Sequence, residues 1–404
     1  MTSERPASVT IVGASLAGLR GAEALRRADY DGAITLLGAE PHLPYDRPPL
    51  SKKILAGVWE LEKSQLATAE RLGELSIDVE LGVTATGLDL AGRTLSTNTG
   101  DRPFDALMIA TGARCRNLPG ADELAGVHVL RGLDDCAALR SELAGATGRV
   151  VVIGAGFIGA EVAATAQTME LDVTMLEAAP HPLQRVLHPD LGQLMADIHV
   201  EHGVDVRCGV GVAGLGSEDG RVTNVQLDDG TVIDAEIVVV GIGVIPNTEW
   251  LEGSGLTIDN GVVCDATTLA APGVTAAGDV ARWASPRYGG ELLRVEQWDN
   301  AVSMGMHAAV RLITPDDEAT VYDPVPWFWS DQFDRKIQLA GRSYPDVELH
   351  VVEGTVEERR FVALLEREGA YVGVFGMNRP RHVMQYKGLL DQGASLADAL
   401  AAGF

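Results

Sequence analysis

Short apolar runs alternate with helical patterns through most of the chain. Two segments, Leu19–Arg27 and Glu161–Gln167, follow apolar runs and have helical patterns. The runs that are typical of buried strands are Val9–Val12, Ala33–Leu37, Phe104–Ile109, Val150–Ile153, Asp172–Leu176 and Ile237–Val240. This alternation of strands and helices predicts an α/β architecture.

The first apolar run ends in a loop of glycine and small residues. The loop and the start of the next segment contain Gly13, Ser15, Leu16, Ala17 and Gly18. Gly13 would allow a tight turn, and Gly18 would allow a helix to pack closely on the strand. Glu40 follows 22 residues after Gly18, the distance at which an acid binds a ribose hydroxyl. The middle position, usually glycine, is Ser15, so a plain turn stays the alternative.

The same pattern recurs in complete form 141 residues later. Its loop contains Gly154, Gly156, Phe157, Ile158 and Gly159, a full G-x-G-x-x-G between a strand and a helix. Glu177 comes 18 residues after Gly159, at the end of the next strand. A carboxylate there would accept from a 2′-hydroxyl and repel a 2′-phosphate, which favours NADH over NADPH. Arg185 lies nearby, but spacing alone does not identify it as a phosphate ligand. Two such folds imply two nucleotides, or one nucleotide and a decayed copy.

Further segments carry candidate chemistry or a plain structural role. They are the proline-rich loop Pro44–Lys52 with its cations Arg47 and Lys52, Ala110-Thr111-Gly112, Gly241–Asn247, and Gly273–Asp279. The prolines fix the backbone, so this loop is either a connector or a rigid holder of two cations against a phosphate-bearing or electron-rich ligand. Asp279 could accept from polyol hydroxyls or cap a helix.

The last quarter of the chain has a different pattern. Pro324–Phe333 concentrates aromatic residues in a chain that is only 5% aromatic, which indicates core packing or the lining of a flat ring system. Strand patterns follow at Lys336–Ala340, Val347–Val352, Arg360–Leu365 and Tyr371–Phe375, and helical patterns at Arg381–Leu390 and Leu396–Ala402. These patterns predict a small α+β module. Its basic residues, which are either solvated surface or a docking patch, are Arg335, Lys336, Arg342, Arg379, Arg381 and Lys387.

Composition narrows the classes of function. A length of 404 residues suggests two or three domains, and the net charge of −25 disfavours nucleic acid and anionic membranes as partners. The four cysteines form no C-x-x-C or C-x4-C pair, which argues against structural zinc, a cysteine-bound cluster and a redox-active dithiol. We therefore expect no metal site. No apolar run has membrane-spanning length and no signal peptide is recognisable, so we expect a cytoplasmic protein.

Taken together, the two nucleotide loops, Ala110-Thr111-Gly112, Gly241–Asn247 and Ala276–Asp279 resemble the two-dinucleotide flavoprotein fold of glutathione reductase and its relatives. Pro44–Lys52 and Val325–Gln332 narrow this resemblance to the ferredoxin reductases of oxygenase systems, the putidaredoxin reductase family. The resemblance extends from about residue 7 to about residue 390. It implies FAD on the first nucleotide fold, NADH on the second, and a C-terminal domain that closes over the flavin.

The resemblance also implies domain boundaries. We expect a discontinuous FAD-binding domain at 1–113 and 242–318, an inserted NAD-binding domain at 114–241, and a C-terminal α+β domain at 319–404. Both nucleotide domains would be Rossmann-like. Ala39 stands where relatives often carry an acidic ribose ligand, so the residue that holds the FAD ribose stays open.

Residue roles follow from the same resemblance. Lys52 would lie beside the flavin ring and pair with Glu161 from the NAD-side helix, and these two are the candidate catalytic residues. The other candidate cofactor-binding residues are Gly13, Ser15, Leu16, Ala17, Gly18, Glu40, Arg47, Val83, Ala110, Thr111, Gly112, Arg131, Gly154, Gly156, Phe157, Ile158, Gly159, Glu177, Arg185, Gly243, Gly278, Asp279, Glu296, Trp298 and Trp329. Trp298, in the segment Glu296-Gln297-Trp298, would sit by the isoalloxazine.

The implied activity is NADH-dependent reduction of a small iron–sulfur ferredoxin that serves a monooxygenase or dioxygenase. One alternative is an NADH oxidase or rubredoxin reductase on the same fold; an oxidase would typically need a redox cysteine beside the flavin, where this chain has Ser51-Lys52. Another is an NADH-responsive binding flavoprotein similar to apoptosis-inducing factor. The identity of the ferredoxin and of the terminal oxygenase, and the oligomeric state, do not follow from the sequence.

Overall fold

The computed structural model describes residues 5–404 and divides into two compact units. The first unit holds the chain up to Asp46 together with Gln65–Arg114 and Ile245–Pro326. The second unit holds Arg47–Ser64, Cys115–Val244 and Trp327–Phe404. The chain passes between the units five times, and two of these passages lie within the short paired strands β8 (Ala113–Cys115) and β17 (Val244–Pro246). The three-domain division stays a prediction.

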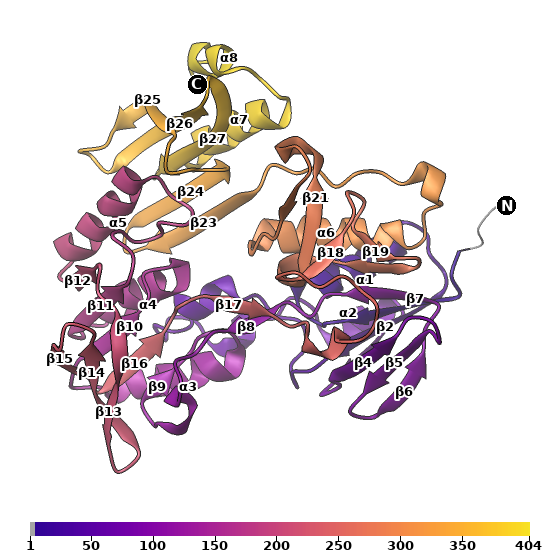
Figure 1. The fold of residues 1–404 in the computed structure, drawn as a ribbon, viewed down its shortest axis with the longest axis horizontal. Coiled ribbons are helices and arrows are strands. Elements are labelled where there is room, and N and C mark those ends of the chain that lie inside the picture. Colours follow the sequence, from indigo (N-terminus) through magenta and orange to yellow (C-terminus); the bar gives the residue numbers. More distant parts are fainter. Residues whose placement is uncertain (1–4) are drawn as a thin grey trace. The chain divides into compact units, whose positions relative to one another are not determined.

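A six-stranded sheet in the order β19-β20-β7-β1-β2-β3 forms the centre of the first unit (Figure 1). Its strands are β1 (Ser8–Val12), β2 (Ala33–Gly38), β3 (Ile77–Leu81), β7 (Ala106–Ile109), β19 (Leu269–Ala271) and β20 (Val274–Ala276). Neighbouring strands are parallel except for the β19–β20 pair. The helices of this unit are α1 (Leu16–Arg27), α2 (Ala69–Glu74) and α6 (Trp298–Arg311). The buried strand side chains pack against α1 and α6, which also contact each other along their length.

Two three-stranded sheets complete the first unit. One contains β4 (Ala85–Asp89), β5 (Thr94–Thr97) and β6 (Gly100–Pro103), and the other contains β18 (Val262–Cys264), β21 (Ala281–Ser285) and β22 (Glu291–Leu293).

A five-stranded, all-parallel sheet in the order β12-β11-β10-β16-β9 lies in the second unit. Its strands are β9 (Val127–His128), β10 (Val150–Ile153), β11 (Val173–Glu177), β12 (Asp205–Cys208) and β16 (Ile237–Val240). The helices that accompany it are α3 (Leu133–Gly145), α4 (Phe157–Thr168) and α5 (Pro189–Glu201). A small antiparallel sheet contains β13 (Val212–Glu218), β14 (Arg221–Leu227) and β15 (Val232–Asp234).

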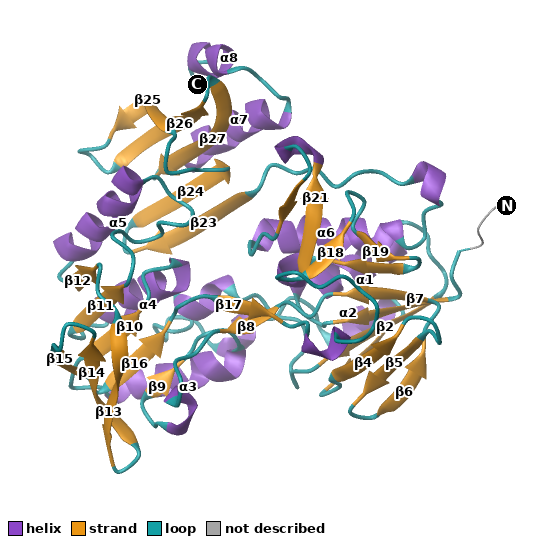
Figure 2. Cartoon of the chain, viewed as in Figure 1, coloured by secondary structure: helices purple, strands orange, loops and turns teal. Residues whose placement is uncertain are grey.

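The end of the chain forms a five-stranded antiparallel sheet in the same unit, in the order β23-β24-β27-β26-β25 (Figure 2). Its strands are β23 (Trp327–Gln332), β24 (Arg335–Gly341), β25 (Glu348–Thr355), β26 (Arg360–Arg367) and β27 (Ala370–Met377). Two helices follow, α7 (Pro380–Asp391) and α8 (Leu396–Ala401). Strand β23 packs against α4, and buried side chains of α5 lie in the same hydrophobic core as the strands of this sheet, so two helices join it to the parallel sheet.

Short 3₁₀ helices lie in several of the segments that connect the strands and α-helices. They are η1 (Pro48–Ser51), η2 (Leu61–Ser64), η3 (Ala121–Glu123), η4 (Glu249–Leu251), η5 (Gly278–Val280), η6 (Pro286–Tyr288) and η7 (Asp316–Glu318). Of the described helices, none is both long and apolar enough to cross a bilayer.

The α/β class and the positions of the main strands are as predicted, but two helix starts were placed too late. Helix α1 begins at Leu16 rather than Leu19, and α4 begins at Phe157 rather than Glu161. The glycines in these stretches were taken as loop, whereas Gly18 and Gly159 lie inside the first turns. The proline-rich loop was also expected to lack regular structure, yet it forms η1, because proline favours the first position of a helical turn.

Candidate functional site

The first glycine loop joins β1 to α1 in the first unit. Gly13 has φ +122°, and a Cβ on it would lie 2.1 Å from the backbone oxygen of Ala110. A Cβ on Gly18 would lie 1.9 Å from the oxygen of Gly13. Both glycines are therefore required by close approach of backbone to backbone, as their spacing predicted. Ser15 is the N-cap residue of α1 and makes no side-chain capping bond.

The second glycine loop repeats this geometry in the second unit. Cβ atoms on Gly154 and Gly159 would lie 2.4 Å from the oxygen of Gly241 and 2.0 Å from that of Gly154. The nearest atom to a Cβ on Gly156 is 3.9 Å away, the oxygen of Gly241, which is ordinary contact. The chain itself therefore leaves room for a side chain at Gly156. A ligand that approaches the backbone closely would explain why glycine stands there.

The carboxylate of Glu177, at the end of β11, is tied to the second loop. Its Oε2 accepts from the backbone N–H of Ala155 at 2.7 Å, and its Oε1 accepts from that of Ala179 at 2.8 Å. Each carboxylate oxygen can accept more than one hydrogen bond, so a ribose hydroxyl could still bind. Arg185 is exposed on the segment that follows, between β11 and α5.

The N-termini of α1 and α4 share a property that suits anion binding. Neither helix has an acidic residue in its first turn, and neither N-cap residue makes a side-chain capping bond. The free N–H groups and the positive end of the helix dipole favour a negatively charged group. Phe157 and Ile158 form the first turn of α4, and Leu16 and Ala17 form that of α1.

Other predicted residues of the first unit lie in well-bonded loops. Thr111 donates through Oγ1 to the backbone oxygen of Asn247 at 2.9 Å, and Asn247 donates back to the oxygen of Thr111 at 2.8 Å. These bonds fix the segment that also holds Ala110 and Gly112. The Glu40 carboxylate accepts from the hydroxyl of Tyr45.

A tryptophan and an aspartate meet in the same unit. Trp298 begins α6, and its Nε1 donates to Asp46 Oδ1 at 2.7 Å. The sequence predicted Trp298 but missed Asp46, which sits between the prolines of Pro44–Lys52 and had no motif to mark it. Nearby in the chain, Glu296 pairs with Arg294 at 2.5 Å. The backbone oxygen of Asp279, in η5 beside Gly278, accepts from Arg294 at 3.2 Å.

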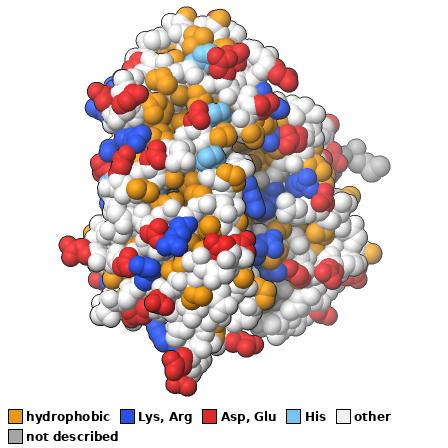
Figure 3. All heavy atoms as spheres, turned by 60° about the vertical axis from the view of Figure 1, so that its left-hand side comes forward, with side chains coloured by type: hydrophobic (Ala, Val, Ile, Leu, Met, Phe, Trp, Pro, Cys, Tyr) orange, Lys and Arg blue, Asp and Glu red, His pale blue; other side chains and the backbone are white. Residues whose placement is uncertain are grey.

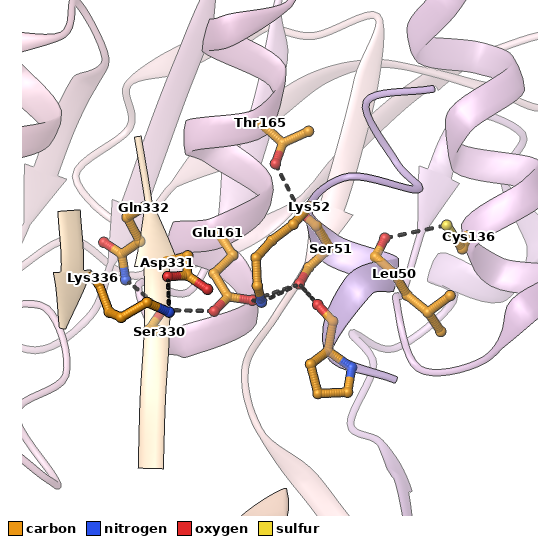
Figure 4. Close-up of polar contacts among 11 residues, drawn as sticks. Leu50, Ser51, Lys52, Cys136, Glu161, Thr165, Ser330, Asp331, Gln332 and Lys336 are labelled. Atoms are coloured by element: carbon orange, nitrogen blue, oxygen red, sulfur yellow. Dashed lines mark hydrogen bonds and ion pairs between the residues drawn. The ribbon is translucent and has the colours of Figure 1, made fainter. Parts of the chain in front are cut away.

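The expected ion pair between Lys52 and Glu161 is present in the second unit (Figure 4). Lys52 Nζ lies 2.5 Å from Glu161 Oε2, and the side chains are 18% and 4% exposed. Ser51 Oγ donates to the same oxygen at 2.5 Å, and Ser330 Oγ donates to Oε1 at 2.6 Å. Three residues from two segments thus meet at the buried carboxylate of Glu161, which belongs to α4.

Two other predicted residues also meet in the second unit. Arg47 donates through Nη1 to the backbone oxygen of Arg131 at 2.6 Å. The N–H of Arg131 donates in turn to Asp135 Oδ2 at 2.9 Å, in the first turn of α3. Val83 is buried in the first unit, and Gly243, with φ +107°, has open space where a Cβ would lie.

Most of the aromatic segment forms strand β23, and of its aromatic side chains Phe328 lies in a buried core, so core packing holds for that residue. Trp327 and Trp329 are half-buried and stack on each other with ring centroids 5.2 Å apart. Ser330 and Gln332 are fully buried. Strand alternation thus turns the polar pair inward with Phe328, a possibility that the run of aromatics concealed.

The four cysteines are all free thiols. Burial raises the pKa of Cys136 to about 11 and that of Cys264 to about 12. Burial also raises the pKa of Cys115 and Cys208. Thiols with raised pKa values are poor nucleophiles near neutral pH.

Three of the six basic residues named for the last quarter form ion pairs, among them Arg335, which pairs with Asp334 at 3.1 Å. Lys336 pairs with Asp331 at 2.6 Å and Lys387 with Asp391 at 2.9 Å. Figure 3 shows acidic and basic side chains interspersed over the face that it presents. A docking patch built from these residues stays a prediction. One group with metal-ligand chemistry, Glu348, His350 and Glu366, lies on β25 and β26, where His350 already bonds Glu366 at 2.6 Å.

Comparisons with known proteins agree with this geometry. Residues 7–305 match the family described as pyridine nucleotide-disulphide oxidoreductase, and residues 327–403 match the one described as reductase C-terminal. Rhodocoxin reductase of Rhodococcus erythropolis is 39% identical, over 95% of this chain and 89% of its own. Putidaredoxin reductase of Pseudomonas putida is 35% identical, over 95% of this chain and 91% of its own. The solved covalent putidaredoxin reductase–putidaredoxin complex aligns with a TM-score of 0.92 at 32% identity, over 98% of both chains. The chain therefore belongs to the pyridine nucleotide-disulphide oxidoreductase family and, within it, to the ferredoxin reductases of oxygenase systems.

Proposed function

We infer that the protein passes electrons from NADH through FAD to a small iron–sulfur ferredoxin, which serves a monooxygenase or dioxygenase. The observation that carries this inference is the pair of glycine loops, each opening onto an acid-free helix N-terminus, in a chain whose relatives are ferredoxin reductases. When bound, FAD takes two electrons from NADH as a hydride and releases them singly to the acceptor.

The first glycine loop is the proposed FAD pyrophosphate site. Gly13 and Gly18 allow β1 and α1 to lie close together, and the N–H groups at the start of α1, which have no partner within the helix, would bind the pyrophosphate. The segments around Thr111 and Asp279 would bind the rest of the molecule, and Trp298 would orient the ring. The bond from Trp298 to Asp46 supports the last role, because it fixes the plane of the indole.

The second loop is the proposed NADH site. The open space at Gly156 suits close approach of a pyrophosphate to the backbone. Glu177, held by two backbone N–H groups, would present its carboxylate to the ribose 2′-hydroxyl and disfavour a 2′-phosphate. We therefore propose NADH rather than NADPH as the donor.

Lys52 and Glu161 are the proposed catalytic pair. By analogy with the relatives, Lys52 would lie beside the flavin and would stabilise the negative charge that the ring gains on reduction. Glu161 holds the ammonium at 2.5 Å in a largely buried setting, so the lysine is fixed before the donor arrives. Neither a protein nucleophile nor a redox thiol is required, which fits four free cysteines of raised pKa.

Domain boundaries and location complete the proposal. We propose an FAD-binding domain at 1–113 and 242–318, an NAD-binding domain at 114–241 and a C-terminal domain at 319–404. We propose the cytoplasm as the location, because a reducing compartment keeps free thiols reduced.

The experiment that tests this function is anaerobic reduction of the purified flavoprotein by NADH in a stopped-flow instrument. Lys52→Ala should lower the limiting rate of flavin bleaching roughly tenfold to hundredfold, the effect of losing one charge-assisted interaction in the transition state. The matched control is Lys53→Ala, since Lys53 is the adjacent lysine, exposed and placed 4.6 Å from the ring of Trp59. Equal rates for the two variants, with FAD content verified by absorbance, would remove Lys52 from the mechanism.

A further inference from the structure

A buried chain of hydrogen bonds extends from the Lys52–Glu161 pair into the C-terminal sheet (Figure 4). Ser330 Oγ donates to Glu161 Oε1 at 2.6 Å and accepts from Gln332 Nε2 at 3.1 Å. Gln332 Oε1 bonds the Nε2 of His199 at 3.0 Å. Ser330, Gln332 and His199 are each 0% exposed.

All hydrogen bonds in this network are donated in the same direction, from His199 toward Glu161. The amide oxygen of Gln332 can only accept, so His199 must donate from Nε2 and carry its single proton there. Burial lowers the pKa of His199 to about 4, which keeps the ring neutral near pH 7. Its Nδ1 is buried without a partner. Every donor from His199 to Ser330 therefore points toward the carboxylate of Glu161.

The elements that carry these residues differ from those that carry the ion pair. Ser330 and Gln332 lie on β23 of the C-terminal sheet, and His199 lies on α5. Glu161 lies on α4, which packs against β23. A carboxylate with both oxygens bonded from defined directions has little freedom to rotate, and the ammonium that it holds shares this constraint.

We propose that Ser330, supported by Gln332 and His199, is a positioning residue that fixes Glu161 and, through it, Lys52. The proposal rests on the proposed role of Lys52 in flavin reduction. It assigns to the C-terminal sheet a part in hydride transfer, in addition to any part in covering the flavin. A residue of purely structural value would change stability without acting through Lys52.

The test is a double-mutant cycle on the holoenzyme, read out as anaerobic flavin reduction by NADH. Ser330→Ala should lower the limiting rate roughly fivefold to tenfold, less than the full cost of a hydrogen bond to a charged group because Ser330 acts on Lys52 only through Glu161, with the apparent Kd for NADH unchanged. Ser330→Thr, which keeps the hydroxyl and suits a strand, should restore most of the rate. In the background of Lys52→Ala, Ser330→Ala should have no further effect, because both changes disable the same group.

The matched control is Asp331→Asn. Asp331 is the next residue along β23, faces the other way and pairs with Lys336, so this variant should reduce its flavin at the wild-type rate. If Ser330→Ala does not retain FAD, Gln332→Met removes the donor behind Ser330 and should show a smaller loss that also vanishes in the Lys52→Ala background.

Three outcomes are distinguishable. A wild-type rate for the positioning variants, or a loss that multiplies with that of Lys52→Ala, would overturn the positioning role while leaving the proposed function intact. A wild-type rate for Lys52→Ala itself would overturn the proposed role of Lys52 and the positioning role with it. Equal losses for Ser330→Ala and Asp331→Asn would show a general effect of the strand and would also contradict the proposal.

Discussion

The two glycine loops share a backbone design but differ at their middle positions and in their acids. In each loop, the outer glycines face backbone oxygens at 1.9–2.4 Å from a would-be Cβ, so the fold itself demands them. The middle position is Ser15 in the first loop and Gly156 in the second, where a Cβ would meet nothing closer than 3.9 Å. Glu177 accepts from the backbone of its own loop, whereas Glu40 accepts from Tyr45.

This difference separates two kinds of glycine within one motif. Gly13, Gly18, Gly154 and Gly159 are explained by contacts inside the chain. Gly156 is not: it is the N-cap residue of α4, a position that glycine suits, and the proposed NADH pyrophosphate in front of the loop would give a second reason for it. A sequence motif thus contains both glycines that the loop backbone requires and glycines proposed to contact the cofactor. The structure is needed to distinguish the two kinds.

The largest expected effect is on folding. Gly18→Ala places a methyl group 1.9 Å from the oxygen of Gly13, and we expect it to destabilise the protein by about 3 kcal/mol or more. The control is Gly73→Ala, the same change in helix α2, where a Cβ meets nothing within 4 Å. That variant should gain up to about 1 kcal/mol of stability.

Thermal unfolding of the two glycine variants measures this contrast. Opposite shifts of the midpoint are expected, downward for Gly18→Ala and upward or absent for Gly73→Ala. A Gly18→Ala protein as stable as the wild type would mean that the loop can relax, and the outer glycines would lose their structural explanation.

A smaller effect is expected on the choice of nucleotide. Glu177→Gln removes the negative charge but keeps an oxygen that can accept from the N–H of Ala155. The ratio of kcat/KM for NADPH to that for NADH should rise about tenfold to hundredfold, because the repulsion of a 2′-phosphate is lost. Glu218→Gln, at an exposed position on β13, removes the same charge from the same unit and should leave the ratio unchanged. If the ratio is unchanged in both variants, Glu177 does not bind the ribose.

The smallest expected effect, that of Gly156→Ser, tests the difference between the middle positions of the two glycine loops most directly. Gly156→Ser gives the second loop the middle residue of the first. Its φ of −72° suits any residue, so we expect stability within about 0.5 kcal/mol of the wild type. The KM for NADH should rise about fivefold, because a side chain enters the space proposed for the cofactor and costs about 1 kcal/mol of binding. An unchanged KM would show that NADH does not approach this glycine.

Much of the fold was predictable from local patterns. The strands β10 and β16 were predicted to the residue, because four consecutive β-branched apolar residues have no stable place except a buried sheet. The helices α1 and α4 were predicted to begin three and four residues late, because glycine was taken to mark a loop. Here glycine serves close packing inside a helix, which local propensity does not reveal.

The sequence predicted those site residues that lie in recognisable motifs, and it did not predict the others. Lys52 and Glu161 were paired in advance by resemblance, and they meet at 2.5 Å. Ser330 and Gln332 were missed, because their importance arises from β23 packing on α4 more than 160 residues away from Glu161. Such long-range contacts leave no local pattern in a single sequence.

The central claim is that one chain takes electrons from NADH and delivers them through FAD to an iron–sulfur acceptor. The most direct test is anaerobic titration of the purified holoprotein with NADH and with NADPH, followed by addition of an oxidised ferredoxin. The account predicts a flavin spectrum that NADH bleaches much faster than NADPH, and two ferredoxins reduced for each NADH consumed. A protein that binds no FAD after reconstitution, or whose flavin NADH cannot reduce, would contradict it.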